Sequence, residues 1–268
     1  MKFIPRWRLR KPAEDEKTVY VSERHGVRQL HIGSDTVQSA MRIARPYDLE
    51  LAYTRSMMGF LLFRPVPRRV LFVGLGGGSL AKFIRHYFPE SLCEAIEIDP
   101  QVLTVARQCF LLPDDDPGLT VSIGDGAEYV AQSGRQYDVI MVDGYEAESP
   151  AEALTSAAFY RDCHERLSDG GVLVANLWSG DRTFNETLLR IESAFPDGTL
   201  CLPAKKPGNV SAFAFRGAPA SIDWATLEVE AERLAALCGL DFPDFVLALR
   251  KMNRHDDERV YLLPDDCF

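Results

Sequence analysis

From residue 69 onward, short apolar stretches alternate with longer amphipathic ones. The apolar stretches are typical of buried β-strands, which we expect at residues 70–73, 95–98, 119–123, 139–142 and 172–175. The amphipathic stretches predict helices at residues 80–87, 101–109, 127–132 and 157–167. Two more strands are expected near residues 198–202 and 211–215, and two more helices at 224–237 and 242–251. Short apolar strands separated by helices favour a doubly wound α/β fold, in which helices cover both faces of a parallel sheet.

The N-terminal part of the chain has a different pattern. Residues 1–17 form a mixed basic and acidic tail, and residues 18–43 contain alternating, strand-like segments separated by turn residues. These features predict a small antiparallel β unit. A helical pattern over residues 49–63 follows, with Leu49, Tyr53, Met57 and Phe60 near one face. We therefore expect two parts: residues 1–64 with the tail, the β unit and a linking helix, and residues 65–268 with the larger α/β domain.

Composition excludes several protein classes. The chain has 268 residues, of which 46% are hydrophobic and 26% charged, and no apolar run approaches the length of a membrane span. The basic N-terminus is not followed by an apolar segment, so we expect no secretory signal and a cytoplasmic protein. The net charge of −9 makes nucleic acid a poor partner. Neither the six cysteines nor the five histidines have the spacing of metal ligands, so no metal site is expected.

A glycine-rich turn follows the first strand of the larger domain. Gly74, Gly76 and Gly78 let backbone N–H groups approach a ligand at the positive end of the next helix. The dinucleotide fingerprint would place a third glycine at position 79, which is Ser79 here. The glycine spacing suits an adenosylmethionine-type site better than an NAD site.

Acidic residues stand at the carboxyl ends of the next three strands. Glu97 lies 23 residues after Gly74, the spacing at which one βαβ unit places a carboxylate beside a ribose. Asp125 can accept a hydrogen bond from an adenine amino group, and Asp143 ends the fourth strand. Ligands of doubly wound sheets bind at the carboxyl ends of the strands, so we expect one nucleoside-binding crevice. Trp178, just beyond the fifth strand, either lines this crevice or packs against the fold.

With these residues in place, the chain resembles the spermidine synthase family, the polyamine aminopropyltransferases, over residues 18–215. The segment 143–173 carries the clearest similarity. The resemblance implies a small N-terminal β domain joined to a methyltransferase-like Rossmann domain, usually in a homodimer. It also implies that decarboxylated S-adenosylmethionine donates an aminopropyl group to a small diamine such as putrescine, without a metal ion.

The resemblance also implies roles for individual residues. The family's ribose-binding glutamate falls on Glu97, and its adenine-binding pair falls on Asp125 and Gly126. Its D-x-x-D-P segment falls on Asp143, Glu146 and the closing Pro150, which makes the two acids the candidate catalytic bases. The expected donor-binding residues are Gly74, Gly76, Gly78, Glu97, Asp125, Gly126, Pro150 and Gln38. The expected acceptor-binding residues are Tyr53 and Tyr145.

Three departures from the family pattern leave alternatives open. The aspartate that grips the donor's amine is Gly77 here, Tyr53 is followed by Thr54 and Arg55, and a late Tyr-Pro pair resembles residues 206–207, a lysine and a proline. One alternative is therefore a methyltransferase that uses intact S-adenosylmethionine, whose carboxylate Arg55 would pair with. The other is a nucleoside-binding module without catalytic activity.

Overall fold

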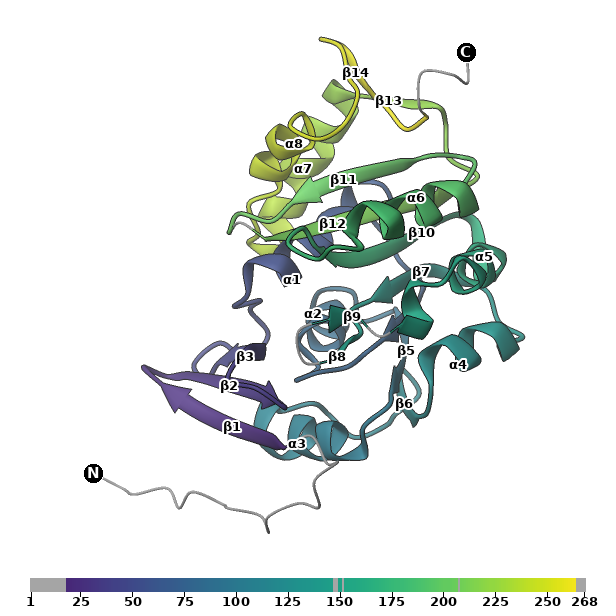
Figure 1. Cartoon of the computed structure of the whole chain (residues 1–268). Helices are drawn as coiled ribbons and strands as arrows, with labels where there is room; N and C mark the ends of the chain where they lie inside the picture. The colour runs from purple at the N-terminus through teal and green to yellow at the C-terminus, as the bar shows by residue number, and fades with distance from the viewer. Residues whose placement is uncertain (1–17, 147–148, 151, 207, 264–268) are drawn as a thin grey trace.

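The computed structural model describes residues 18–146, 149–150, 152–206 and 208–263 (Figure 1). Its centre is a seven-stranded sheet with the order β11-β12-β10-β7-β4-β5-β6. These strands are β4 (Arg69–Val73), β5 (Leu92–Glu97), β6 (Leu119–Ile123), β7 (Tyr137–Val142), β10 (Leu167–Trp178), β11 (Thr199–Pro203) and β12 (Asn209–Arg216). The five strands from β10 to β6 are parallel, and β12 pairs antiparallel with both β10 and β11. The predicted doubly wound α/β fold is confirmed.

Helices cover both faces of this sheet, as Figure 1 shows. One face packs against α1 (Ala52–Met57), the 3-10 helix η1 (Met58–Leu62), α2 (Ser79–Tyr87), α3 (Pro100–Phe110), α7 (Trp224–Cys238) and α8 (Phe242–Leu249). The other packs against α4 (Gly126–Gln132), α5 (Ala157–Arg166) and α6 (Phe184–Ala194). Strand β4 serves both cores, since Val70 and Phe72 face the first layer and Leu71 and Val73 the second. A strand buried on both faces reads as a continuous apolar run, which is why the sequence pattern located β4.

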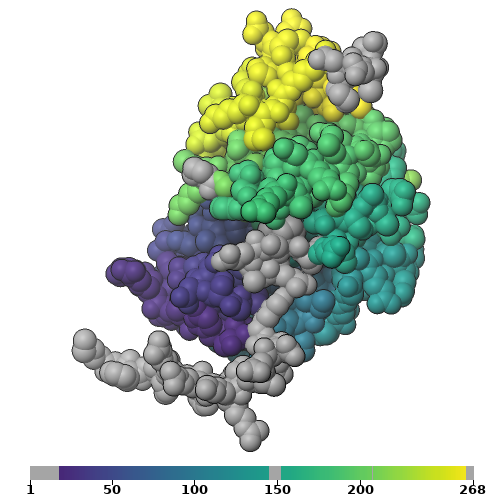
Figure 2. Space-filling model, viewed as in Figure 1, coloured from purple at the N-terminus to yellow at the C-terminus, as the bar shows by residue number. Residues whose placement is uncertain are grey.

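A separate three-stranded antiparallel sheet forms the N-terminal unit: β1 (Val19–Arg24), β2 (Val27–Ile32) and β3 (Val37–Arg42). This unit, purple in Figures 1 and 2, lies at the opposite end of the molecule from the yellow C-terminal segment. Leu30 and Met41 of the unit pack against Val102 and Phe110 of α3. Helix α1, by contrast, contacts β10 and β12 of the large sheet. The division of the chain at residue 64 stays a prediction.

Some elements were not predicted. Helix α6 was not predicted, because its Leu189 is 60% exposed and an apolar residue on the solvent side weakens the amphipathic pattern. Strand β10 is 12 residues long, since it continues backward through the polar turn residues 168–171, where the pairing register shifts. The short strands β8 (Tyr145–Glu146), β9 (Ser149–Pro150), β13 (Ser221–Asp223) and β14 (Arg259–Tyr261) and the 3-10 helix η2 (Glu152–Thr155) carry too few residues for a periodic signal. Over the described ranges, no helix combines the length and apolar character that crossing a membrane requires.

Candidate active site

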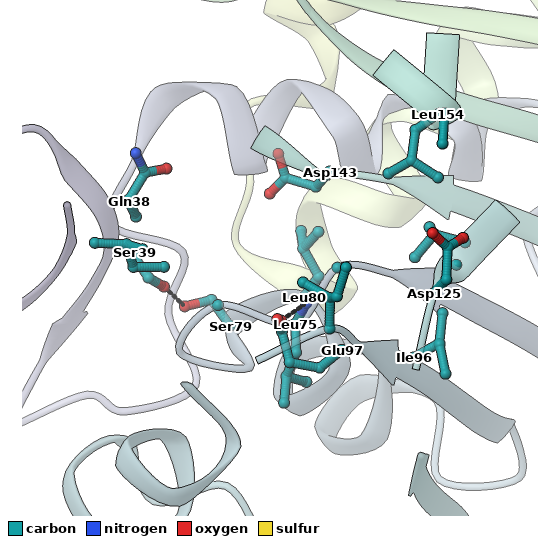
Figure 3. Close-up of a pocket in the computed structure, with 18 of the residues that line it drawn as sticks. Gln38, Ser39, Leu75, Ser79, Leu80, Ile96, Glu97, Asp125, Asp143 and Leu154 are labelled. Atoms are coloured by element: carbon teal, nitrogen blue, oxygen red, sulfur yellow. Dashed lines mark hydrogen bonds between the residues drawn. The ribbon is translucent and has the colours of Figure 1, made fainter. Parts of the chain in front are cut away.

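A cavity of about 290 Å³ opens at the carboxyl ends of β4, β5, β6 and β7. Figure 3 shows Gln38 and Ser39 at one end, Asp125, Ile96 and Leu154 at the other, and Asp143 between them. Eight of the residues expected at the site line the cavity: Gln38, Tyr53, Gly74, Gly76, Glu97, Asp125, Gly126 and Asp143. The topology explains this convergence, because parallel strands end at one edge of the sheet.

The glycine turn after β4 is shaped by steric limits. Gly74 has φ +92°, and a Cβ there would collide with the carbonyl oxygen of Asp143 on the neighbouring strand end. Gly78 has φ +71° and forms the N-cap of α2, where a Cβ would collide with Leu112. Positive φ values are strained for any residue with a Cβ, so glycine is required at both positions. Gly78 does not itself line the cavity; its role is to allow the backbone conformation of the turn.

Glu97 ends β5 and is 7% exposed. Its Oε2 accepts a hydrogen bond from the Leu75 N–H (3.0 Å), and its Oε1 accepts one from the Asp99 N–H (3.0 Å). Burial raises the pKa of this carboxyl, while the N–H groups of Asp99, Leu75 and Gly76 oppose the rise. The glutamate thus holds the glycine turn in place and still faces the cavity, where it can accept from the hydroxyls of a sugar (Figure 3).

Asp125 forms the N-cap of α4. Its Oδ1 accepts hydrogen bonds from the N–H groups of Ala127 (2.7 Å) and Glu128 (3.0 Å), which fixes the carboxylate at the mouth of the cavity. At Gly126, a Cβ would collide with Val73, so the helix begins close to the sheet. Ile96 and Leu154 add apolar walls at this end. The combination of apolar walls and a fixed carboxylate suits a flat base with an amino group.

Asp143 follows β7 and lies beside Asn176 of β10, whose Nδ2 donates to its Oδ1 at 2.8 Å. The Tyr53 hydroxyl lies within hydrogen-bond reach of both Asp143 and the Gln38 carbonyl oxygen (3.1 Å), and its single proton is donated to one of them at a time. Burial raises the pKa of the Asp143 carboxyl above its usual range, against these two hydrogen bonds. A carboxylate with a raised pKa is a better proton acceptor near neutral pH than an exposed one.

The cavity is strongly acidic. Among the described residues that line it, Glu97, Asp125, Asp143 and Glu152 are carboxylates, and none is a lysine, an arginine or a histidine. Such a lining attracts cations and disfavours anionic groups. In the part of the chain that the structure describes, no three His, Cys, Asp or Glu side chains are grouped to hold a metal ion.

The positions that depart from the family pattern lie in different surroundings. A Cβ at Gly77 would come within 2.8 Å of both Phe110 and the Ser39 hydroxyl, so these side chains fill the space of an aspartate there. Arg55 is exposed, its Nε donates to the Leu49 carbonyl oxygen (2.6 Å), and it does not line the cavity. Lys206 is exposed and also lies outside the cavity lining, and residue 207 is outside the described residues. The geometry therefore gives no support to the expected pairing between Arg55 and a donor carboxylate.

Three expected site residues follow Asp143 in the chain. The backbones of Tyr145, Glu146 and Pro150 belong to the short strands β8 and β9, but their side chains lie outside the described part of the structure. Their roles in catalysis, acceptor binding and donor binding stay predictions.

Sequence reasoning missed several residues of the site. Ser39, Thr54, Ser79, Glu152 and Leu154 line the cavity, and Asn176 holds Asp143. Ser39 and Ser79 come from the N-terminal unit and from α2, yet their hydroxyls lie 3.3 Å apart (Figure 3). Ser79 directly follows the glycine turn and Thr54 follows Tyr53, so both stand beside motif residues, whereas no local motif marks Ser39 or Asn176. Only the position of Asn176, at the end of the apolar run of β10, could have pointed to it.

Comparisons with known proteins show which family this chain is similar to. The family model of the spermine/spermidine synthase domain matches residues 50–196. The polyamine aminopropyltransferase of Chromobacterium violaceum is 41% identical over 249 residues, which cover 93% of this chain and 95% of the relative.

Solved structures show the same fold. A probable spermidine synthase from Corynebacterium glutamicum superposes with a TM-score of 0.71 at 18% identity, covering 90% of this chain and 94% of that one. Human methyltransferase-like protein 13 in complex with SAH superposes with a TM-score of 0.59 at 28% identity, covering 77% of this chain and 92% of that one.

Proposed function

The chain belongs to the spermine/spermidine synthase family, and from this premise we propose that it transfers an aminopropyl group from decarboxylated S-adenosylmethionine to a diamine such as putrescine. The observation that carries the proposal is the placement of Asp143: a carboxylate with a raised pKa, held between Asn176 and Tyr53 in a cavity whose described lining has no cationic side chain. Both the donor and the acceptor of this reaction are cations, which such a cavity attracts.

In this proposal the nucleoside of the donor occupies the end of the cavity between Glu97 and Asp125. Glu97 accepts hydrogen bonds from the ribose hydroxyls, and Asp125 accepts one from the adenine amino group, next to Gly126. The turn at Gly74 and Gly76 lets the donor approach the backbone closely. Gln38 and Pro150 complete the donor site.

Asp143 then acts as the general base. The acceptor amine is protonated at neutral pH, because alkyl ammonium groups have pKa values near 10. Asp143 takes one proton, the freed amine attacks the carbon next to the sulfonium, a C–N bond forms and the C–S bond breaks. Methylthioadenosine leaves with the bonding electron pair. Tyr53 and Tyr145 orient the acceptor, and Glu146 supplies a second carboxylate.

Further acceleration comes from holding the two substrates in line. The reaction needs no nucleophilic side chain, because the sulfonium is already a good leaving group. The chain's task is to exclude water, orient the acceptor and receive its proton.

A second candidate is methyl transfer from intact S-adenosylmethionine. Gly77 favours it, because a glycine does not repel the carboxylate of that donor, and so does the 28% identity with a human methyltransferase-like protein. The acidic cavity opposes it, since no lysine, arginine or histidine appears in the described lining to receive the carboxylate. The first proposal therefore has the stronger support.

The experiment that separates the candidates offers the purified protein each donor in turn, together with putrescine. Mass spectrometry of the products is the measurement, and spermidine plus methylthioadenosine from the decarboxylated donor is the expected result. A methylated amine plus S-adenosylhomocysteine from the intact donor would overturn the proposal in favour of methyl transfer. Binding of methylthioadenosine without any transfer would point to the non-catalytic alternative.

The homodimer and the cytoplasmic location stay predictions drawn from the family resemblance and the N-terminal sequence. Light scattering on the purified protein is the direct test of the first: a mass of 60 kDa, twice the chain mass of 30.0 kDa, is expected, and a mass of one chain would contradict it.

A further inference from the structure

The face of the sheet next to α1 turns from apolar to polar beside Asp143. On β10, the apolar row of Val172 and Val174 continues to Asn176, while on β12 the row of Phe215 and Phe213 continues to Ser211 and Asn209. In the antiparallel pairing, residue 176 is opposite 211 and residue 178 is opposite 209. Asn176 and Asn209 are therefore diagonal neighbours on one face, within reach of each other.

Two hydrogen bonds join these asparagines to the candidate base. Asn209 Nδ2 donates to Asn176 Oδ1 at 3.0 Å, and Asn176 Nδ2 donates to Asp143 Oδ1 at 2.8 Å. An asparagine amide has an acceptor on one side and a donor on the other, so the bond made by one side orients the other. With Asn209 donating, the Asn176 amide presents its NH2 group to Asp143, and the carboxylate, which can only accept, favours the same orientation.

We propose that Asn209 is a positioning residue of the reaction, which acts through Asn176 to hold the Asp143 carboxylate as a hydrogen-bond acceptor facing the cavity. This inference rests on the proposed function, in which Asp143 takes the proton of the acceptor amine. Asn176 is 7% exposed, and a buried amide with both sides bonded is far better defined than one that can rotate.

The loop before β12 holds Asn209 in position. The Asn209 carbonyl oxygen accepts from the Ala204 N–H (2.9 Å), and the Gly208 carbonyl oxygen accepts from the Ser179 N–H (2.7 Å). Gly208 has φ +121°, and a Cβ there would collide with the ring of Trp178. Trp178 therefore packs on this loop and does not line the cavity, which settles its role in favour of packing.

The orientation of Asn176 has a consequence for protonation. An NH2 group that faces the carboxylate stabilises its charged form and opposes the effect of burial on the pKa of Asp143. A rotated amide would present its oxygen, which stabilises the protonated form instead. The other titratable groups on the described walls of this cavity are Tyr53, Glu97, Asp125 and Glu152, and a substitution at Asn209 changes none of them.

The test compares Asn209→Ala, Asn176→Ala and the double variant. The first readout is the pH dependence of kcat/KM for the acceptor, in which each single variant should move the acid limb upward by about one pH unit relative to the unmodified protein. In the double variant the shift should equal that of Asn176→Ala alone, because Asn209 acts only through Asn176.

Ser211→Ala is the matched control. It lies on the same strand and face, and its hydroxyl is hydrogen-bonded to Ser56 (2.9 Å), outside the relay formed by Asn209, Asn176 and Asp143. Its acid limb should not move.

The second readout does not need activity. The carboxyl carbon of Asp143, assigned by the NMR signal that Asp143→Asn removes, should titrate at higher pH in Asn209→Ala. An unchanged titration in a folded Asn209→Ala, or an equal shift in Ser211→Ala, would overturn the proposal. If Asn209→Ala does not fold, Asn176→Ala must show the shift by itself, and its absence would overturn the proposal equally. Absence of transfer in the unmodified protein, with the titration shift present, would reject the proposed function and retain the relay.

Discussion

Strand β5 carries two buried glutamates with opposite surroundings. Glu94 and Glu97 lie three residues apart, and each is 7% exposed. Glu94 is bonded to two cations and two phenols: Arg135 (2.6 Å), Arg69 (3.5 Å), and the hydroxyls of Tyr129 and Tyr137 (both 3.0 Å). Among the described residues, the hydrogen bonds to Glu97 come from backbone N–H groups, and its side chain faces the cavity. The same strand thus carries one carboxylate, Glu94, whose charge is balanced by arginines, and a second carboxylate, Glu97, whose charge is available to a ligand.

Strand β7 repeats the contrast with aspartates. Asp138, at the beginning of the strand, accepts from Arg64 (2.6 Å), the Ser168 hydroxyl (2.9 Å) and the Arg68 N–H (2.7 Å). Burial by itself would raise the pKa of Asp138, but these bonds outweigh it and the pKa is lowered. The pKa of Asp143, just beyond the end of the strand, is raised. The difference teaches that burial alone does not mark a functional acid. The described lining of the cavity contains no cationic side chain to pair with Asp143, so a cationic substrate can take that place.

The largest effect is expected from Asp143→Asn. The amide keeps the shape of the side chain but cannot take a proton, so turnover should fall by about 10²- to 10⁴-fold. Calorimetric binding of methylthioadenosine should stay within a few-fold of the unmodified protein, because Asp143 does not hold the nucleoside. Normal turnover would remove Asp143 from the mechanism. Asp138 and Asp143 would then no longer differ as a structural and a catalytic acid.

The next effect concerns Glu97→Gln. If Glu97 accepts from the ribose hydroxyls as proposed, the loss of its charge should weaken methylthioadenosine binding by about 10- to 100-fold, as expected for hydrogen bonds to an ionised group. Isothermal titration measures the Kd. The matched control is Glu94→Gln on the same strand, whose Kd should equal that of the unmodified protein. Equal weakening in both variants would show that the effect comes from the strand and not from the site.

Glu94→Gln should instead lower stability. The glutamine leaves Arg135 and Arg69 without their carboxylate, and we expect a loss of about 1–2 kcal/mol, a modest value because Arg135 is largely exposed. Urea unfolding followed by circular dichroism provides the measurement. A destabilisation as large in Glu97→Gln would mean that the cavity carboxylate contributes as much to folding as the paired one.

The smallest expected effect is the pH dependence of stability. The lowered pKa of Asp138 contributes stability that is present above the unfolded pKa of about 4 and lost as the pH falls through the folded pKa. The raised pKa of Asp143 acts in the opposite sense, since its stability is present below about pH 4 and lost as the pH rises through the folded pKa.

At pH 7, Asp138→Asn should therefore unfold at lower urea concentration than the unmodified protein, and Asp143→Asn at higher. The Asp143→Asn difference should shrink as the pH falls from 7 toward 4, whereas the Asp138→Asn difference should persist to about pH 4 and shrink only below it. A destabilised Asp143→Asn at pH 7 would contradict the assignment of a raised pKa to that carboxyl.

The amino-acid sequence by itself determined the positions of Glu97, Asp125 and Asp143 at one edge of a parallel sheet. Each stands at the carboxyl end of a short apolar strand, and parallel strands joined by helices must all end at the same edge, so order along the chain is enough to bring these side chains together. For the same reason, the glycines of the turn after β4 could be assigned before any coordinates were known. This covers the doubly wound domain and the end of the cavity at which we propose that the nucleoside binds.

Only the tertiary structure decided which acids have cationic partners and which residues hold them. Glu94 and Glu97 look alike in the sequence, and Arg135, which pairs with Glu94, lies 41 residues away. The bond between Asn209 and Asn176 depends on the antiparallel register of β12 against β10, and no motif in the chain encodes that register. Hydrogen bonds require atoms within about 3 Å of each other, and distances of that size between distant segments are set by packing and not by spacing along the chain.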